Sequence, residues 1–166
     1  MEKVGIGVDV GGTSVKLGLF QPDGTILKKW EFPTDTSENG THILPDIAES
    51  IRKTMEETFQ GKAELIGVGI GVPGPVQPTG YVEVGVNLHW REMYPARELS
   101  ELLDGVRVEV GNDANVAALG EAWRGGGEGA ANAVLLTLGT GVGGGVIMNG
   151  EIVTGKHGLA GEVGHI

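Results

Sequence analysis

Two glycine-rich segments carry threonine side chains at a spacing that could hold a phosphate group. The first is Asp9-Val10-Gly11-Gly12-Thr13 with Lys16 close behind, and the second covers residues 138–145 as Leu-Gly-Thr-Gly-Val-Gly-Gly-Gly. Glycines let the backbone approach a ligand closely, so that several N–H groups can point at one anion. Thr13 could add a hydroxyl, Lys16 a cation and Asp9 a carboxylate for a metal ion. A plain hairpin turn that needs positive φ is the alternative explanation of Gly11 and Gly12.

The second segment does not match either of the common nucleotide-binding fingerprints. It lacks the Gly-Lys-Ser/Thr ending of a P-loop, and no helix is expected to follow it, so a dinucleotide fingerprint does not fit either. Alone, this segment is only weak evidence for a phosphate-binding loop. Two Thr/Gly loops that each join two strands could, however, clamp the two sides of one polyphosphate.

Polar side chains gather where a strand is expected to end and a helix to begin, in Gly111-Asn112-Asp113-Ala114-Asn115. The carboxyl edge of a sheet is where α/β proteins bind ligands. Asp113 could simply cap the helix, but Asn112, Asp113 and Asn115 together exceed what one helix start needs. Further along, Gly161-Glu162-Val163-Gly164-His165 supplies a carboxylate and an imidazole, which in isolation would be solvated loop residues.

Predicted strands and helices alternate along the chain and position these groups. Apolar residues at helical spacing predict a helix over 41–59, and shorter helices are expected at 96–103 and 114–123. Strands are predicted at 4–10, 15–20, 26–32, 65–72, 106–110, 133–138 and 145–148, with a hairpin turn at Asn149-Gly150. This order predicts an α/β sheet with helices on its faces. Gly125-Gly126-Gly127 is the best candidate for a domain boundary or hinge, so we expect one unit over 1–127 and the beginning of another over 128–166.

The composition argues against several classes of binding partner and site. The 166 residues include 31 glycines, and 12 Lys and Arg against 22 Asp and Glu give a net charge of −10. That charge argues against binding a nucleic-acid backbone or an anionic membrane, so any phosphate must be held mainly by backbone N–H groups and by one or two well-placed cations. Zero cysteines exclude disulfides and a self-contained cysteine zinc site. We find no signal peptide and no apolar run near the roughly 20 residues of a membrane span, and therefore expect a cytoplasmic protein.

Taken together and in order, the motifs resemble those of bacterial ROK-family glucokinases. The resemblance covers essentially the whole chain and rests on residues 9–13, 73–75, 86–88, 112–115, 138–145 and 161–165. It implies the actin/hexokinase/Hsp70 fold, in which ATP and a sugar bind between two ribonuclease-H-like lobes. This chain would then be one lobe with a mixed βββαβα sheet, plus the first strands of a second lobe.

The resemblance also implies a role for each matching residue. Asp113 matches the catalytic base that accepts the proton of a glucose hydroxyl. Candidate sugar-binding residues are Gly74, Asn87, Asn112, Asp113, Glu162 and His165. Candidate ATP-binding residues are Asp9, Gly11, Gly12, Thr13, Lys16, Thr137, Gly139, Thr140, Gly141, Val142 and Gly143, with Asp9 near Mg²⁺. His165 also matches a ligand of the family's structural Zn²⁺.

The chain departs from the family after its last motif. The cysteine cluster that completes the zinc site, a further sugar-binding glutamate, the adenine pocket and a closing helix are all missing. We therefore expect an N-terminal half of a glucokinase that is inactive alone and that associates through residues 133–153, as a symmetric dimer, or leaves them poorly ordered. A non-catalytic assembly module is the alternative. A ROK-type sugar-sensing regulator is disfavoured because those proteins carry an N-terminal helix-turn-helix domain.

Overall fold

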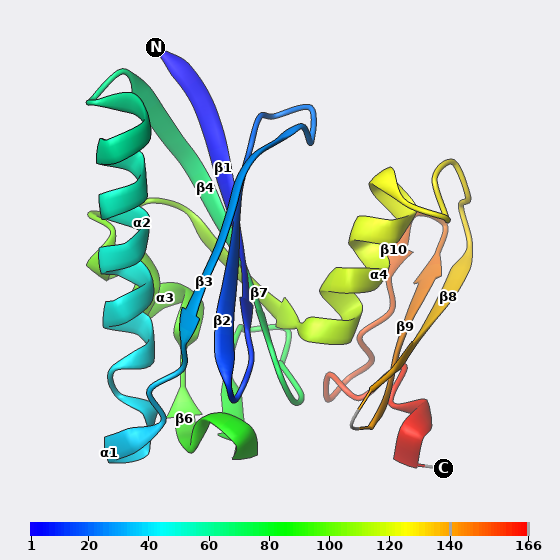
Figure 1. The fold of residues 1–166 in the computed structure, drawn as a ribbon. Coiled ribbons are helices and arrows are strands. Elements are labelled where there is room, and N and C mark those ends of the chain that lie inside the picture. The colour runs from blue at the N-terminus through cyan, green and yellow to red at the C-terminus, as the bar shows by residue number, and fades with distance from the viewer. Residues whose placement is uncertain (140, 166) are drawn as a thin grey trace.

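A five-stranded mixed sheet forms the larger part of the protein (Figure 1). The computed structural model describes residues 1–139 and 141–165, and for residue 165 the backbone only. The strands of this sheet are β1 (Glu2–Val10), β2 (Ser14–Phe20), β3 (Ile26–Pro33), β4 (Ala63–Val72) and β7 (Val108–Asn112). Their order is β3-β2-β1-β4-β7; β1, β2 and β3 form an antiparallel meander, and β4 and β7 continue it in parallel.

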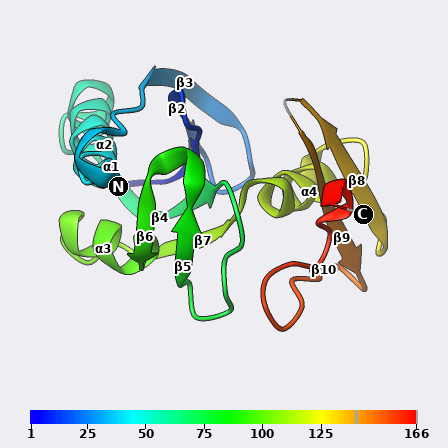
Figure 2. The ribbon, with the colours of Figure 1, turned by 90° about the horizontal axis from the view of Figure 1, so that it is seen from below.

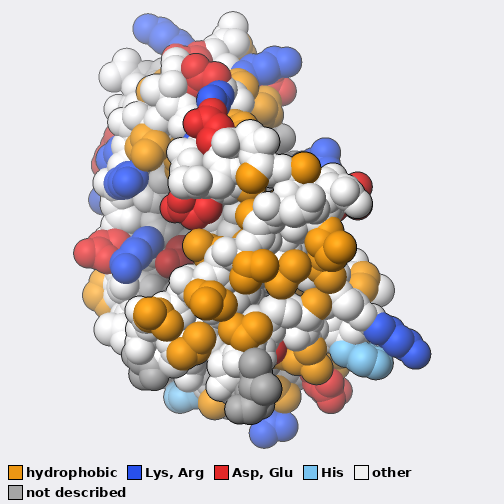
Figure 3. Space-filling model, turned by 90° about the vertical axis from the view of Figure 1, so that its right-hand side faces the viewer, with side chains coloured by type: hydrophobic (Ala, Val, Ile, Leu, Met, Phe, Trp, Pro, Cys, Tyr) orange, Lys and Arg blue, Asp and Glu red, His pale blue; other side chains and the backbone are white. Residues whose placement is uncertain are grey.

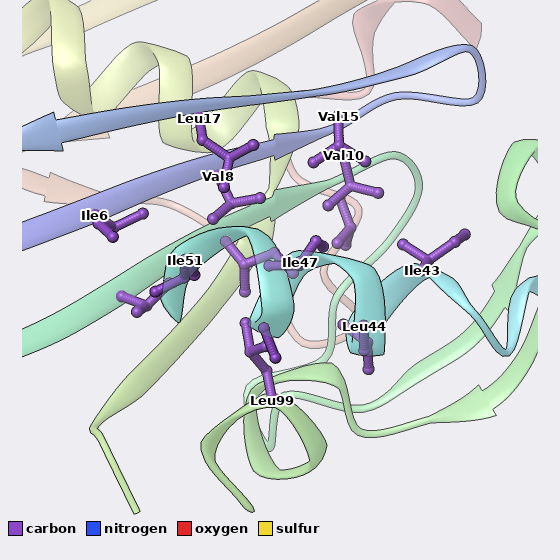
Figure 4. Packing of buried hydrophobic residues seen from close by; sticks show 14 of the residues in the cluster. Ile6, Val8, Val10, Val15, Leu17, Ile43, Leu44, Ile47, Ile51 and Leu99 are labelled. Carbon is purple, nitrogen blue, oxygen red and sulfur yellow. The ribbon is translucent and has the colours of Figure 1, made fainter. Parts of the chain in front are cut away.

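One face of this sheet is closed by helices. The short α1 (Ser37–Gly40), α2 (Ile43–Phe59) and α3 (Pro95–Leu102) lie on the same side of it (Figures 1 and 2). Alternate residues of β1 point into the interface because side chains alternate along a strand. There they meet the apolar stripe of α2, and Figure 4 shows Val8, Val10, Ile47 and Ile51 converging in this core.

The other face of the sheet carries glycines instead of large side chains. Gly5, Gly7 and Asp9 alternate with the buried valines and isoleucine of β1, and Gly67, Gly69 and Gly71 occupy the corresponding face of β4. A Cβ added at Gly69 would have no atom within 4 Å. This face is therefore open next to Asp9.

A second, antiparallel sheet follows, with strand order β10-β9-β8. Its strands are β8 (Ala133–Leu138), β9 (Val142–Met148) and β10 (Glu151–Ile152), and the chain ends in the 3₁₀ turn η2 (Val163–His165). Asn149 and Gly150 both have positive φ between paired Met148 and Glu151, which confirms the predicted hairpin turn.

Helix α4 (Asp113–Arg124) lies between the two sheets and contacts both (Figure 1). Its Ala114 and Ala118 face β9, while its last residues reach the turn between β2 and β3, where the Arg124 guanidinium donates to the Asp23 carbonyl at 2.7 Å. The division of the chain at residue 127 stays a prediction. None of the helices in the described ranges is long and apolar enough to cross a membrane.

The α/β architecture is confirmed, but two local predictions are wrong. Strand β9 begins at Val142 and not at residue 145, so Gly143, Gly144 and Gly145 are strand residues. They are glycines because α4 and the chain near Gly161 pass directly against them: a Cβ on Gly145 would lie 2.5 Å from the Ala118 Cβ.

The second miss is a hairpin of β5 (Val82–Gly85) and β6 (Trp90–Met93), joined through the 3₁₀ turn η1 (Val86–Leu88). Both strands have only four residues, too few to give a clear alternation. The hairpin is anchored by the buried Trp90, whose indole N–H donates to the Gly40 carbonyl at 3.0 Å.

We predict that Gly145→Ala destabilises the protein, because its new methyl group collides with Ala118 in a contact that neither backbone can relieve. Overpacking of this kind costs about 1–3 kcal/mol of unfolding free energy. The matched control is Gly69→Ala, also in a strand but with open space beside it, which should stay within about 0.5 kcal/mol of the parent. Urea denaturation measures the unfolding free energy of each variant. Equal losses of unfolding free energy in the two variants would contradict the packing of α4 against β9.

Candidate active site

The turn between β1 and β2 presents free backbone donors at the edge of the sheet. The Gly11 N–H donates to the Ser14 carbonyl at 3.0 Å. Thr34 holds the other side: its hydroxyl donates to the Gly11 carbonyl at 2.6 Å and its N–H to the Thr13 carbonyl at 2.9 Å. Within the described part of the chain, the N–H groups of Gly12 and Thr13 donate no hydrogen bond. Thr34 was not among the expected site residues, and no sequence signal marks it.

The glycines of this turn are required for space and not for backbone angle. Neither Gly11 nor Gly12 has positive φ, so the alternative of a turn that needs positive φ is wrong. A Cβ on Gly11 would lie 2.8 Å from the Ser14 carbonyl oxygen, and one on Gly12 would lie 3.0 Å from that of Asn87. The turn therefore touches the η1 segment, and Asn87 and Gly12 are neighbours.

Lys16 follows the same turn on β2. It is the ladder partner of Asp9 on β1, so the two side chains project from the same face of the sheet. Lys16 is exposed to solvent.

The loop between β8 and β9 contains glycines that neither a backbone angle nor a close contact in the described chain requires. The Gly139 N–H donates to the Gly141 carbonyl at 2.9 Å. Neither glycine has positive φ, and a Cβ on either would meet no atom within 4 Å. Thr140, between them, lies outside the described residues. These glycines leave the backbone open to approach from outside.

The other second-loop candidates lie in strands. Thr137, the last residue but one of β8, pairs with Gly143, and Val142, which begins β9, is 43% exposed. Thr137 and Gly143 face α4, since a Cβ on Gly143 would approach both the Thr137 hydroxyl and the Ala114 methyl. The Thr137 side chain thereby reaches the space beside the helix start.

The buried amide of Asn112 joins the end of β7 to the start of α4. Its oxygen accepts from the N–H groups of Ala114 at 3.1 Å and Asn115 at 3.2 Å, and its nitrogen donates to the Gly74 carbonyl at 2.8 Å. Asn112 is therefore the N-cap, and Asp113 is not. An amide nitrogen carries two hydrogens, so one donor of Asn112 remains for a ligand.

Because Asn112 caps the helix, the Asp113 carboxylate is free to face a cleft. One of its oxygens accepts from the adjacent Ala114 N–H at 2.8 Å. The cleft has a volume of about 390 Å³, and Asp9, Gly71, Asp113 and Thr137 are among its lining residues. It thus joins strand β1, the start of α4 and the second sheet.

The surroundings of Asp113 favour its protonated form. Burial raises the pKa of its carboxyl group most, because neighbouring protein atoms displace water although the side chain stays accessible. The Ala114 N–H opposes this, and the Asp9 and Glu162 carboxylates raise the pKa further by repulsion. A raised pKa in a cleft is typical of general bases.

The segment with Glu162 is held against β9 by backbone contacts. A Cβ on Gly161 would lie 2.7 Å from the Gly144 carbonyl oxygen, and Gly164 passes equally closely by Val142. Glu162 is thereby placed where its charge acts on Asp113. The side chain of His165, the other candidate here, lies outside the described part of the chain.

A larger cavity, of about 560 Å³, lies along β7 on another side of α4. Asn112 and Asn115 reach it, but Asp113, Asp9 and Glu162 do not line it. We assign the candidate site to the smaller cleft because the carboxylates of Asp9 and Asp113 both line it.

Comparison with known proteins identifies the family of this chain. A profile of the ROK family matches residues 5–166. The chain is 46% identical to a glucokinase from Halalkalibacterium halodurans and 42% identical to one from Thermotoga maritima, in each case over 97% of this chain and 49% or 50% of the relative. The chain thus spans about half the length of these relatives.

Among solved structures, a ROK family glucokinase from Streptomyces griseus in complex with glucose and AMPPNP superposes with a TM-score of 0.80. It is 34% identical, and the match covers 98% of this chain and 50% of that one. The match of fold, ordered motifs and family profile means that this chain belongs to the ROK family.

Proposed function

We propose that this chain forms the first half of an ATP-dependent sugar kinase that converts glucose to glucose 6-phosphate, and that the transfer takes place in the cleft at Asp113. The observation that carries the proposal is the second loop. Gly139 and Gly141 have neither a positive φ nor a close neighbour in the described chain that would require glycine. Glycines are expected there if a ligand must approach the backbone. The glucokinase relatives and the Streptomyces griseus complex with glucose and AMPPNP support it.

Phosphoryl transfer requires positioning and charge neutralisation more than covalent help from the protein. The sugar oxygen forms a bond to the γ-phosphorus as the bond from that phosphorus to the β,γ-bridging oxygen breaks, and ADP leaves. Asp113 accepts the hydroxyl proton, and its raised pKa suits this role. The unused N–H groups of Gly12 and Thr13 and the backbone of the second loop bind the phosphates.

The sugar lies on the Asp113 side of the cleft. Asn112 offers its remaining amide hydrogen, and Asn87, next to Gly12, offers a donor and an acceptor. Glu162 accepts hydroxyl hydrogens, and Gly74 approaches through its backbone. His165 is proposed for the same role from the resemblance alone.

The two metals of the family fit this chain differently. Mg²⁺ prefers oxygen ligands and uses one or two protein carboxylates beside phosphates and water, and Asp9 at the cleft wall suits it. When bound it would neutralise phosphate charge. The 166 residues do not by themselves supply a cysteine zinc site, because they include no cysteine, and the described residues include no group of three or more His, Asp or Glu side chains placed to hold a metal. Since the reaction consumes ATP, we place it in the cytoplasm.

The test is a chimera in which residues 1–166 precede the second half of the Halalkalibacterium halodurans glucokinase. In a coupled assay with glucose and ATP, the chimera should form glucose 6-phosphate, and the 166-residue chain alone, the matched control, should form none. A folded chimera that binds neither glucose nor AMPPNP would contradict the proposal and favour the non-catalytic assembly role.

In the chimera, we predict that Asp113→Asn lowers kcat by roughly 10²–10⁴ and changes KM for glucose only a few-fold, because it removes a general base but keeps the shape of the side chain. Steady-state kinetics measure both. A variant with near-normal kcat would remove Asp113 from the role.

The same substitution should stabilise the 166-residue chain at pH 7. The folded state binds the Asp113 proton more tightly than the unfolded state does, so the loss of stability grows as the pH rises from the unfolded to the folded pKa and is complete above the folded pKa. This cost is absent below the ordinary value of 3.8. Urea denaturation should therefore show a gain at pH 7 that vanishes near pH 3, whereas the control Glu49→Gln, on exposed helix surface, should show no such gain. A loss at pH 7 would contradict the assigned surroundings of Asp113.

Replacing Gly139 or Gly141 by Val should weaken AMPPNP binding to the chimera at least tenfold and change the unfolding free energy by less than about 1 kcal/mol, because the side chain obstructs only the ligand. Calorimetric titration and urea denaturation give the two values. Parallel losses of affinity and stability would mean that these glycines serve the fold.

A further inference from the structure

The direction of the backbone N–H groups matters in the turn between β1 and β2, because this chain has few cations. It carries 12 Lys and Arg against 22 Asp and Glu. On the side of the molecule that carries the second sheet, hydrophobic side chains form the middle of the surface, and Lys and Arg lie mostly towards its margins (Figure 3). A phosphate at the turn therefore depends on backbone donors, and within residues 1–139 and 141–165 the N–H groups of Gly12 and Thr13 donate no hydrogen bond.

A contact from the Thr34 side chain sets the direction of the Gly12 N–H. A trans peptide group is planar, so the carbonyl of Gly11 and the N–H of Gly12 point in opposite directions within one plane. The Thr34 hydroxyl donates to the Gly11 carbonyl oxygen at 2.6 Å. Because this bond holds the oxygen on the Thr34 side of the turn, the Gly12 N–H faces the other side. The Thr34 N–H donates to the Thr13 carbonyl at 2.9 Å, which fixes Thr34 to the end of the turn.

Thr34 begins a segment, residues 34–40, that is also anchored away from the turn. The Thr36 carbonyl accepts a hydrogen bond from His89 Nδ1 at 3.0 Å, and the Gly40 carbonyl accepts one from the buried indole N–H of Trp90 at 3.0 Å. His89 and Trp90 directly follow η1. The position of Thr34 is therefore supported by contacts that do not involve the turn.

The peptide group between Gly11 and Gly12 has a second neighbour in η1. A Cβ on Gly12 would lie 3.0 Å from the Asn87 carbonyl oxygen and 3.2 Å from the Asn87 Cβ. The Gly11 N–H is already used by the Ser14 carbonyl at 3.0 Å. Among the described side chains, Thr34 is the one whose hydrogen bond reaches this peptide group, so its hydroxyl is the group that a substitution can remove.

We propose that the Thr34 hydroxyl is a positioning group for ATP, because it aims the Gly12 N–H at the phosphates. This inference rests on the proposed function, in which the first turn binds phosphate. A hydroxyl has one hydrogen to donate, and the Gly11 carbonyl takes it. Thr34 therefore acts on the nucleotide through the peptide group and not by touching it.

Thr34→Val in the chimera tests this role, since valine keeps the branched shape and the backbone bond to Thr13 but lacks the hydroxyl. The dissociation constant for AMPPNP should rise on the order of tenfold, as expected for a misaligned hydrogen bond to a charged group, and that for glucose should stay within two-fold. Thr34→Ser should restore the affinity for AMPPNP. In the matched control, Thr41→Val, the hydroxyl that is lost donates to the Glu38 carbonyl at 3.0 Å, and both affinities should stay within two-fold.

Steady-state kinetics separate positioning from a purely structural role. Loss of positioning raises KM for ATP and leaves KM for glucose unchanged, whereas loss of folded protein lowers kcat and leaves both KM values unchanged. Thr34→Ala removes the same hydroxyl with a smaller side chain and should raise KM for ATP in the same way, so the test does not depend on the folding of one variant.

A measurement without nucleotide follows the peptide group itself. By ¹⁵N relaxation of the 166-residue chain, the order parameter of the Gly12 N–H should be about 0.85, as in rigid backbone, in the parent and in Thr34→Ser. In Thr34→Val it should fall towards the ~0.6 of flexible backbone.

The outcomes distinguish this proposal from the proposed function. A folded parent chimera that does not bind AMPPNP would refute the proposed function and with it the role of Thr34. If the parent binds AMPPNP, an unchanged affinity in Thr34→Val, equal losses for AMPPNP and glucose, or a Gly12 N–H that is as ordered in Thr34→Val as in the parent would overturn the role of Thr34 alone.

Discussion

The amide group of Asn112 is the contact on which the site depends. It ties the Gly74 carbonyl to the start of α4 and satisfies two of the helix's first N–H groups, which otherwise lack partners. Because this side chain is the cap, the neighbouring Asp113 is not used for that purpose. A carboxylate is thereby left at the beginning of a helix, facing the cleft, on a backbone that is fixed on both sides.

Close backbone contacts position the other segments around the candidate site. Gly145 lets α4 pack onto β9, Gly161 lets the Glu162 segment cross it, and Gly12 brings η1 against the first turn. At Gly145 and Gly161 a Cβ would lie less than 3.0 Å from a neighbouring atom, and at Gly12 it would lie 3.0 Å away. Such an arrangement suits the proposed binding of phosphate through backbone N–H groups, because the acidic chain has few cations.

Much of this was predictable from the sequence. Hydrophobic periodicity gave the strands and helices of the first sheet, and the turn at Asn149-Gly150 was readable because its two residues tolerate positive φ. The candidate residues were found as glycine and polar motifs, and the structure brings Asp9, Asp113, Thr137 and Glu162 together.

The remainder depends on tertiary contacts that no local pattern encodes. Gly143 resembled a loop residue because the need for a glycine there comes from Thr137 and from Ala114 of α4, which belong to separate segments. The sequence offered Asp113 as a possible cap, whereas the cap is Asn112, whose amide nitrogen donates to the carbonyl of Gly74, a residue distant in sequence. Thr34 supports the first turn only because β3 returns beside it.

The central claim is that the Asp113 carboxyl group lines one cleft together with Asp9 and lies close enough to Glu162 for both charges to act on it. Its titration by ¹³C NMR in the 166-residue chain tests this most directly. The account predicts a pKa above the ordinary value of 3.8 that moves down in Asp9→Asn and in Glu162→Gln, because each removes a repelling charge. A pKa at the ordinary value that neither substitution changes would contradict it.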